Sequence, residues 1–398
     1  MIFNEWTYAA FLLVSVVGFA LVPRERHAHW LALMGASFYA FYGGPWLLVF
    51  VVEILVSRYY LPRGKIALFG IIQAVCLLAL VKYGAFFGNV LIHLGMLAGL
   101  GTHPPLRPFP LPLGLSFFVF EFIHYAADRR KGRAEQTSIP VYGSFILFFP
   151  TMIAGPIKRI QDYVPALQRA SVNAADLWTG ASRIALGLCK KAIIADNINL
   201  FLADTILAPN APDPGGPLTA RRLTLAFNIV LYSLRIYLDF SSYSDIAIGS
   251  ARLFGIHVPE NFNWPYLARN PSEFWKRWHI SLSRWITDYI YIPLGGSRGA
   301  SFQRQAFNTI VAMGLSGLWH GAAGNFVVWG LYHALLIITY RLIEPVWRRR
   351  VPERLREHAI LRFGYVLTNF AAVAIGWVFF ATPLSVAFRY VSRLVGLS

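Results

Sequence analysis

Long apolar runs recur along the chain and leave few folds open to it. They lie around residues 7–22, 29–43, 45–57, 66–81, 84–101, 111–127, 140–154, 180–207, 223–250, 305–318, 324–343 and 363–381, with a short one at 384–396. A helix of about 20 apolar residues crosses the ~30 Å hydrocarbon core of a bilayer. Of the 398 residues, 56% are hydrophobic and only 14% are charged, far from the balance of a soluble domain. The sequence therefore predicts an all-α polytopic membrane protein.

The number of membrane crossings is harder to predict than the fold class, because glycine and proline interrupt several of the apolar runs. We expect about 9–11 transmembrane helices, with re-entrant or interfacial helices that line an enclosed cavity. No internal repeat or linker divides the chain, so residues 1–398 are predicted to form a single membrane-embedded domain. The first run is followed by Pro23–Arg26 rather than by a small-residue cleavage site, and is expected to be a retained anchor.

Charge is distributed as in a membrane protein. The formal net charge is +17, and the basic residues cluster beside apolar runs, at 24–26, 58–65, 129–133 and 348–356. Cytoplasmic loops carry this bias, which favours a bacterial inner membrane protein over a nucleic-acid binder. Part of the excess charge could hold anionic lipid headgroups or an acidic carrier protein. Cys76 and Cys189 are predicted to be small core residues rather than a disulfide or a nucleophile.

The stretch Glu260–Gly299 is rich in Trp, Arg and Asn. Asn270, Pro271 and Glu273 form a helix-start signal, and an amphipathic interfacial helix is predicted over 270–293. At 100° per residue its two faces separate. The aromatic face is Phe274, Trp275, Trp278, Leu282, Trp285, Ile286 and Tyr289, and the polar face is Arg277, Ser281, Arg284 and Asp288. His279 falls on the aromatic side, where an imidazole needs a partner.

His320 is the residue on which the functional prediction depends. It lies in Gly317–Gly321, between the apolar runs Thr309–Gly317 and Phe326–Tyr340. An imidazole at bilayer depth costs a few kcal/mol, so it should face the protein interior or a wet cavity. A neutral imidazole can take a proton from a hydroxyl and return it to a leaving thiolate. We expect His320 and His279 to be catalytic, with a satisfied core histidine as the alternative for each.

Other polar residues interrupt apolar runs. Asp239, Ser241, Ser242 and Asp245 either line a polar cavity or form a structural network. Glu121 and His124 have the Glu-x-x-His spacing of carboxylate-bridged metal sites, but the second copy that such a site needs is missing, so no metal is predicted. The nucleophile elbow Gly-x-Ser-x-Gly has no match, its nearest string being Gly314–Leu318. Direct acyl transfer without a covalent enzyme intermediate is therefore expected.

Several motifs in a fixed order resemble the membrane-bound O-acyltransferase (MBOAT) family. The resemblance is strongest to its bacterial branch, which includes alginate O-acetyltransferase and teichoic-acid D-alanyltransferase, and it covers residues 80–345. The motifs that carry it are Asn261–Ser283, Asp288–Gly296, Gly317–Gly321, Leu111–Phe117, Gly155–Arg159 and Asp239–Asp245.

The resemblance implies a ring of transmembrane helices around a central tunnel. It matches His320 to the buried catalytic histidine of the family and His279 to the second motif histidine. No bound cofactor is expected; the substrates would be an acyl thioester, acetyl-CoA or an acyl carrier protein, and a polysaccharide reached directly or through an extracytoplasmic partner acyltransferase. The predicted tunnel wall consists of Trp319, Asn325, Trp275, Trp278, Asp239, Ser241, Ser242, Asp245 and Arg277.

The sequence thus predicts an O-acyltransferase that moves an acyl group, expected to be acetyl, to a cell-surface polysaccharide. D-alanyl transfer to a teichoic-acid-like polymer and lipid O-acylation are the enzymatic alternatives. The non-enzymatic alternatives are a glycan or acyl transporter, for which inverted repeats would be expected, and a scaffold subunit of a synthase complex.

Overall fold

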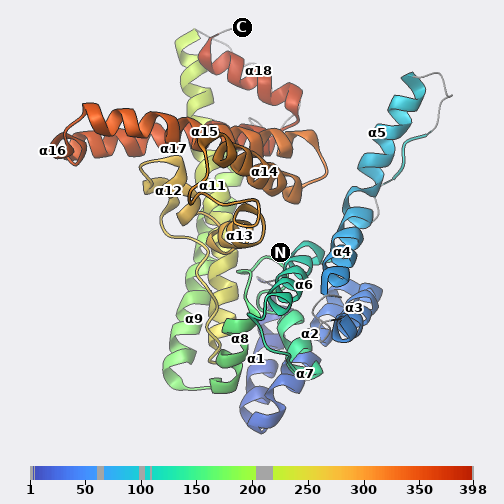
Figure 1. Ribbon diagram of the computed structural model, residues 1–398. Helices are drawn as coiled ribbons and strands as arrows, with labels where there is room; N and C mark the ends of the chain where they lie inside the picture. Colours follow the sequence, from blue (N-terminus) through green and yellow to red (C-terminus); the bar gives the residue numbers. More distant parts are fainter. Residues whose placement is uncertain are drawn as a thin grey trace. The chain divides into compact units, whose positions relative to one another are not determined.

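The computed structural model describes residues 3, 5–60, 67–97, 104–107, 110–202 and 218–396. Within these ranges every regular element is helical (Figure 1). The all-α prediction is confirmed, as expected for a chain whose backbone groups must be satisfied in lipid.

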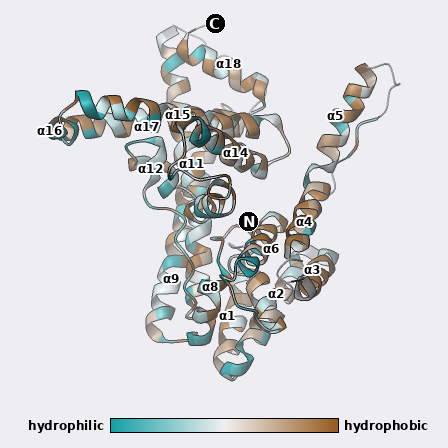
Figure 2. Cartoon of the chain, in the orientation of Figure 1, coloured by the Kyte–Doolittle hydropathy of each residue, from teal (hydrophilic) through white to brown (hydrophobic). Residues whose placement is uncertain are grey.

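Five helical stretches in the described part are long and apolar enough to cross a membrane. They are Arg24–Ser57, Leu68–Leu97, Thr219–Arg252, Gly324–Arg350 and Ala359–Ala381. Figure 2 shows the apolar colouring along helices α4 (Ala67–Leu78), α5 (Gly84–Leu97) and α17 (Ala359–Ala381). The apolar helix Trp6–Leu21 is shorter. The protein is therefore polytopic, whereas the total of 9–11 crossings and the ring around a tunnel stay predictions.

The chain divides into two compact units, residues 1–188 with 243–260, and residues 189–242 with 261–398. The boundary after Leu188 and the boundary after Ser242 each fall inside a continuous helical stretch. Because no loop or change of composition marks them, a search for linkers could not find them.

The first unit contains a core rich in phenylalanine. Phe38, Phe149 and Phe254 are fully buried or nearly so, and their rings contact one another at 5.5–6.0 Å. The helices of this unit are α1 (Trp6–Leu21), α2 (His27–Gly43), α3 (Leu47–Tyr60), α4 (Ala67–Leu78), α5 (Gly84–Leu97), α6 (Leu115–Arg130), α7 (Ile139–Ile146), α8 (Ile160–Arg169), α9 (Ala174–Leu188) and the end of α11 (Leu218–Arg252).

The second unit holds the histidines singled out above. Its helices are α10 (Asp196–Leu202), the first part of α11, α12 (Pro271–Arg277), α13 (Ile280–Ile286), α14 (Phe302–His320), α15 (Gly324–Arg350), α16 (Glu353–Arg356), α17 (Ala359–Ala381) and α18 (Leu384–Val395). Helices α14 and α15 form an antiparallel pair at close range. A Cβ on Gly317 would lie 2.1 Å from the carbonyl oxygen of Phe326, and a Cβ on Gly330 would lie 2.2 Å from that of Met313. Two glycines thus permit the backbone approach, as is common between membrane helices.

The segment 270–293 differs from the single helix that the sequence predicts. Asn270 caps α12 as expected, with its side chain accepting from the Glu273 N–H at 2.8 Å. The helix then stops, and His279 takes a left-handed conformation with φ 42° and ψ 56° before α13 begins. A π-helical turn, Thr287–Tyr291 (η7), follows. The expectation of one continuous helix is therefore wrong. The faces were predicted from a rotation of 100° per residue, and this rotation is interrupted at a residue in the left-handed conformation.

Cys76 and Cys189 are free and exposed, so their prediction as core residues is wrong. Both lie in apolar helical stretches. In a protein with membrane-spanning helices an apolar position can face lipid as well as the core, and hydropathy alone does not distinguish these two surroundings.

Candidate active site

His320 is the last residue of α14 and is held in an aromatic cage. Its ring centroid lies 4.7 Å from that of Trp319, 5.1 Å from Trp329 and 5.0 Å from Phe380. Trp319 belongs to α14, Trp329 to α15 and Phe380 to α17. The imidazole is only half-buried, so three helices fix the ring while leaving part of it accessible.

His279 occupies the break between α12 and α13 and is 1% exposed. The side-chain oxygen of Asn261 lies 3.3 Å from its Nδ1 and accepts from the Ser281 hydroxyl at 2.6 Å. The Asn261 backbone carbonyl also accepts from the Ile280 N–H at 2.9 Å. A left-handed conformation costs a non-glycine residue about 1–2 kcal/mol, and Asn261 holds the backbone and the ring together in that strained position.

Trp319 connects the two histidines. Its ring centroid lies 6.0 Å from that of His279 and 4.7 Å from that of His320. Burial, reinforced by the nearby His320, lowers the pKa of His279 well below its usual value. His279 is therefore neutral at physiological pH, and its Nε2 has no hydrogen-bond partner among the described residues. A neutral imidazole with an open nitrogen can accept a proton.

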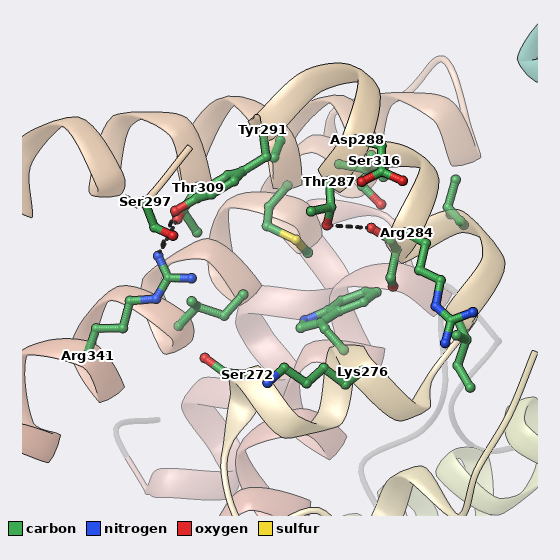
Figure 3. A pocket seen from close by; sticks show the side chains of 18 residues that line it. Ser272, Lys276, Arg284, Thr287, Asp288, Tyr291, Ser297, Thr309, Ser316 and Arg341 are labelled. Atoms are coloured by element: carbon green, nitrogen blue, oxygen red, sulfur yellow. Dashed lines mark hydrogen bonds between the residues drawn. The ribbon is translucent and has the colours of Figure 1, made fainter. Parts of the chain in front are cut away.

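A pocket of about 610 Å³ in the second unit (Figure 3) is lined by Ile280, which follows His279 in the chain, whereas His279 and His320 are not among its lining residues. Ser316 lines it, and Ser316 precedes His320 by one helical turn, about 6 Å along α14. Trp275 lines it as well, with its ring 5.7 Å from that of Trp329, which contacts His320. The pocket therefore reaches the neighbourhood of His320 from the side of α12 and α13.

The pocket combines an apolar wall with cations. Met313 and Ile337 contribute to the wall, while Lys276, Arg284 and Arg341 carry positive charge against the single carboxylate of Asp288. Figure 3 shows Lys276, Arg284 and Arg341 approaching the pocket from different sides. The guanidinium of Arg341 donates to Thr309 Oγ1 at 3.1 Å and to Tyr291 Oη at 3.3 Å, whereas Lys276 and Arg284 form no salt bridge within the described residues. A long, flexible ligand with an anionic end matches this distribution.

His333 is a histidine of this region that the sequence reasoning missed. It is fully buried in α15, stacks on Phe274 at 6.1 Å and 9°, and lies 5.1 Å from Trp329. Neither ring nitrogen has a hydrogen-bond partner in the described part of the chain. It lies in a membrane-spanning run without a flanking polar motif. The only signal in the sequence was that an ionisable residue stands at membrane depth, where such residues are functional candidates.

The polar segment of α11 is explained mainly by structural bonds. Asp239 pairs with Lys191 at 2.6 Å, and in the other unit Asp245 pairs with Arg183 at 2.6 Å. The Ser241 and Ser242 hydroxyls donate to backbone carbonyls three residues earlier. None of these four predicted tunnel residues lines the pocket described above, and their place on a passage stays a prediction.

Of the remaining predicted wall residues, four are not among the pocket's lining residues: Arg277, Trp278, Trp319 and Asn325. Arg277 pairs with Glu273 at 2.6 Å, one helical turn away. Trp278 is buried, with its ring 4.8 Å from that of Trp377. Asn325 donates to the Phe379 carbonyl at 3.2 Å and so links the start of α15 to α17. Trp275 is the predicted wall residue that lines the pocket.

The Glu121–His124 pair also has structural partners. The Glu121 carboxylate forms a buried salt bridge with Lys158, and His124 Nε2 accepts from the Ile160 N–H at 3.2 Å. These contacts fasten α6 to the segment that leads into α8. One potential ligand atom of each side chain, Glu121 Oε1 and His124 Nε2, is therefore engaged with another protein group.

Replacing Asn261 with alanine is expected to loosen His279. The change removes the acceptor of Ser281 and the contact to the imidazole, so we expect a loss of about 1–3 kcal/mol in the free energy of unfolding and a lower kcat. Thermal unfolding of the purified protein, and assays of the acyl transfer that the sequence predicts, measure both. Asn263→Ala, two residues away at an exposed position that bonds to Arg277 only through the Asn263 backbone N–H and carbonyl, is the control. Equal effects of the two changes would contradict the role of Asn261.

Comparison with known proteins shows the family to which this chain belongs. Residues 114–380 match the family model of the membrane-bound O-acyltransferases. The probable alginate O-acetylase of Pseudomonas aeruginosa is 33% identical over 408 residues, covering 98% of this chain and 74% of the relative. The peptidoglycan O-acetyltransferase of Helicobacter pylori is 30% identical over 98% of this chain and 78% of its own length. The teichoic acid D-alanyltransferase of Bacillus subtilis is 28% identical, with 86% and 90% covered. The chain therefore belongs to the membrane-bound O-acyltransferase family and is a multi-pass membrane enzyme that transfers an acyl group to a hydroxyl.

Proposed function

We propose that this protein transfers an acetyl group from a cytoplasmic thioester to a hydroxyl of a cell-surface polysaccharide, directly or through a partner acyltransferase. The observation that carries the proposal is the half-buried His320, paired through Trp319 with the buried His279. The relatives named for acetyl transfer to alginate and to peptidoglycan support the acyl group and the class of acceptor.

In the proposed reaction His320 acts as a general base. It takes the proton of the acceptor hydroxyl while the hydroxyl oxygen attacks the thioester carbonyl carbon. The new C–O bond forms, the C–S bond breaks, and the imidazolium returns the proton to the departing thiolate. The reaction balances without an oxidant or a metal, and a positioned base of this kind contributes roughly 10²–10⁴-fold. His279 would position or shuttle the proton from its place beside Trp319.

The pocket shown in Figure 3 would receive the donor. Acetyl-CoA and an acyl carrier protein both present their thioester on a long arm that begins at a phosphate. Lys276 and Arg284 could hold that phosphate, since hydrogen bonds between charged groups are stronger than those between neutral groups. The arm would lie along the wall that contains Met313 and Ile337. The donor side would face the cytoplasm of a bacterial inner membrane, as the basic loops favour.

Replacing both Lys276 and Arg284 with glutamine is expected to raise the KM for the thioester roughly tenfold or more, with kcat little changed. Each charged hydrogen bond contributes about 1.5–3 kcal/mol, and a loss confined to donor binding appears in KM. Steady-state kinetics with varied thioester would measure it. Arg389→Gln, an exposed position on α18, removes a charge elsewhere and should leave KM unchanged. A fall in kcat at constant KM would contradict the assignment.

D-alanyl transfer is the second candidate, because the teichoic acid D-alanyltransferase aligns over 90% of its length. Analysis of a deletion strain decides among the candidates. Loss of acetyl esters from the polysaccharide fraction is the expected result. Loss of D-alanyl esters would favour the second candidate, and loss of acyl groups from the lipid fraction would favour lipid acylation. A transporter or scaffold would keep its function when His320 is replaced by glutamine.

A further inference from the structure

A second pocket, of about 420 Å³, lies where the end of α15 meets the start of α17 and of α12. It is separate from the histidines and has no part in the reaction proposed above. Both α15 and α17 belong to stretches long and apolar enough to cross a membrane. This pocket therefore opens at the basic ends of two membrane helices.

The pocket is polar at one end and apolar at the other. Helices α15 and α17 run antiparallel and are joined only by residues 351–358, so Arg348 and Arg356 share one end of the pocket. Tyr340 precedes Arg348 by eight residues, which is about 12 Å along the helix. Tyr365 and Ala372, which line the pocket from α17, lie seven residues apart, about 10 Å along that helix.

The charges of the lining residues leave a positive excess. Three arginines face two glutamates, which gives a formal charge of +1. Arg348 pairs with Glu344 at 2.7 Å and Arg269 pairs with Glu357 at 3.2 Å. Arg356 donates through Nε to the Val351 carbonyl, which leaves its terminal nitrogens available as donors.

Two further features suit a lipid at this depth. Trp347 donates through its indole N–H to Tyr365 Oη at 3.0 Å, and such amphipathic rings gather where headgroups meet hydrocarbon. Asn369 is 5% exposed, lines the pocket and donates to the Ala268 carbonyl, while its Oδ1 has no hydrogen-bond partner among the described residues. That oxygen is an acceptor for a hydroxyl-bearing ligand.

We propose that this pocket binds an anionic phospholipid of the cytoplasmic leaflet, with the phosphate on Arg348 and Arg356, a headgroup hydroxyl near Asn369 and an acyl chain along Tyr340 and Ile343. Basic pockets between membrane helices hold such headgroups. The gradient from arginine to apolar side chains matches an amphipathic lipid, whereas a free phosphate would use only the basic end. Because Asn270 and Pro271 also line the pocket, the bound lipid would contact the start of α12.

Native mass spectrometry of the full-length protein in non-ionic detergent, titrated with phosphatidylglycerol and with phosphatidylcholine, tests the proposal. We expect tighter binding of phosphatidylglycerol, and a roughly 10- to 30-fold loss in the double variant Arg348→Gln, Arg356→Gln, at about tenfold per 1.4 kcal/mol. The variant Glu344→Gln should bind more tightly, a gain that misfolding cannot produce.

The matched control is Arg349→Gln with Arg354→Gln. It removes the same charge from the same two helices at exposed positions that do not line the pocket, and should keep wild-type affinity. An equal loss in both double variants would overturn the proposal in favour of general surface charge. Competition by glycerol phosphate as strong as by the lipid would identify a soluble anion site, and displacement of the lipid by an acidic carrier protein would identify a protein docking site; either result would overturn it.

Discussion

Replacing His320 with alanine is expected to reduce acyl transfer by roughly 10²–10⁴-fold, the contribution of a positioned general base, while the protein remains folded in the membrane. The ring ends α14 and is half-buried, so its removal leaves the helix intact and opens only a small space among Trp319, Trp329 and Phe380. The measurement is ester content of the polysaccharide in a complemented deletion strain, together with the amount of variant in the membrane fraction.

The matched control for this variant is His358→Ala. His358 is exposed, precedes α17 and makes no side-chain cap hydrogen bond, so the same change there should leave transfer unchanged. His320→Gln preserves size and hydrogen bonding but cannot act as a base at neutral pH. Wild-type transfer by either His320 variant would remove the enzymatic assignment of this residue.

The second large effect concerns folding. Gly330→Ala is expected to lower the free energy of unfolding by about 3 kcal/mol, at the upper end of what overpacking costs, because the new Cβ would lie 2.2 Å from the Met313 carbonyl oxygen. Helix α14 would have to move away from α15, and His320 would move with it. Thermal unfolding in detergent and acyl-transfer activity should therefore fall together.

Gly364→Ala in α17 is the control for that prediction, since a Cβ there meets nothing within 4 Å. Alanine is the better helix former by about 1 kcal/mol, so this change should leave stability equal or higher. The two substitutions are chemically identical, but we expect Gly330→Ala to lower the free energy of unfolding and Gly364→Ala to keep or raise it. A stable Gly330→Ala protein would show that the contact between α14 and α15 relaxes easily.

Composition was sufficient to predict the helical membrane fold, because only a few architectures satisfy the backbone of so apolar a chain. The helix start at Asn270 was also predictable from its capping signal. The break at His279 was not, because it depends on Asn261, eighteen residues earlier, which contacts the His279 ring and bonds to Ile280 and Ser281 directly after it. Local periodicity contains no information about such a contact.

The site was predictable in part. Both candidate histidines lie in one unit and share Trp319 as a neighbour, while their catalytic roles stay predictions. The partners of Asp239 and Asp245 were not predictable, since Lys191 and Arg183 lie about fifty to sixty residues away in the sequence. The lining of the pocket was missed for a similar reason: Arg341 and Thr309 come from helices that meet only after folding.

The π turn Thr287–Tyr291 gives the pocket an unusual sensitivity to chain length. A π turn holds one residue more than the regular helix around it, and Thr287, Asp288 and Tyr291 from this turn line the pocket, whereas Ile290 does not. Deleting Ile290 would allow an ordinary turn to form, which would change the directions of the side chains within the turn while the residues after it keep their register. In related chains, the gain or loss of one residue in this turn would change several of the groups that face the ligand at once. Several point substitutions would have to be combined to produce the same change.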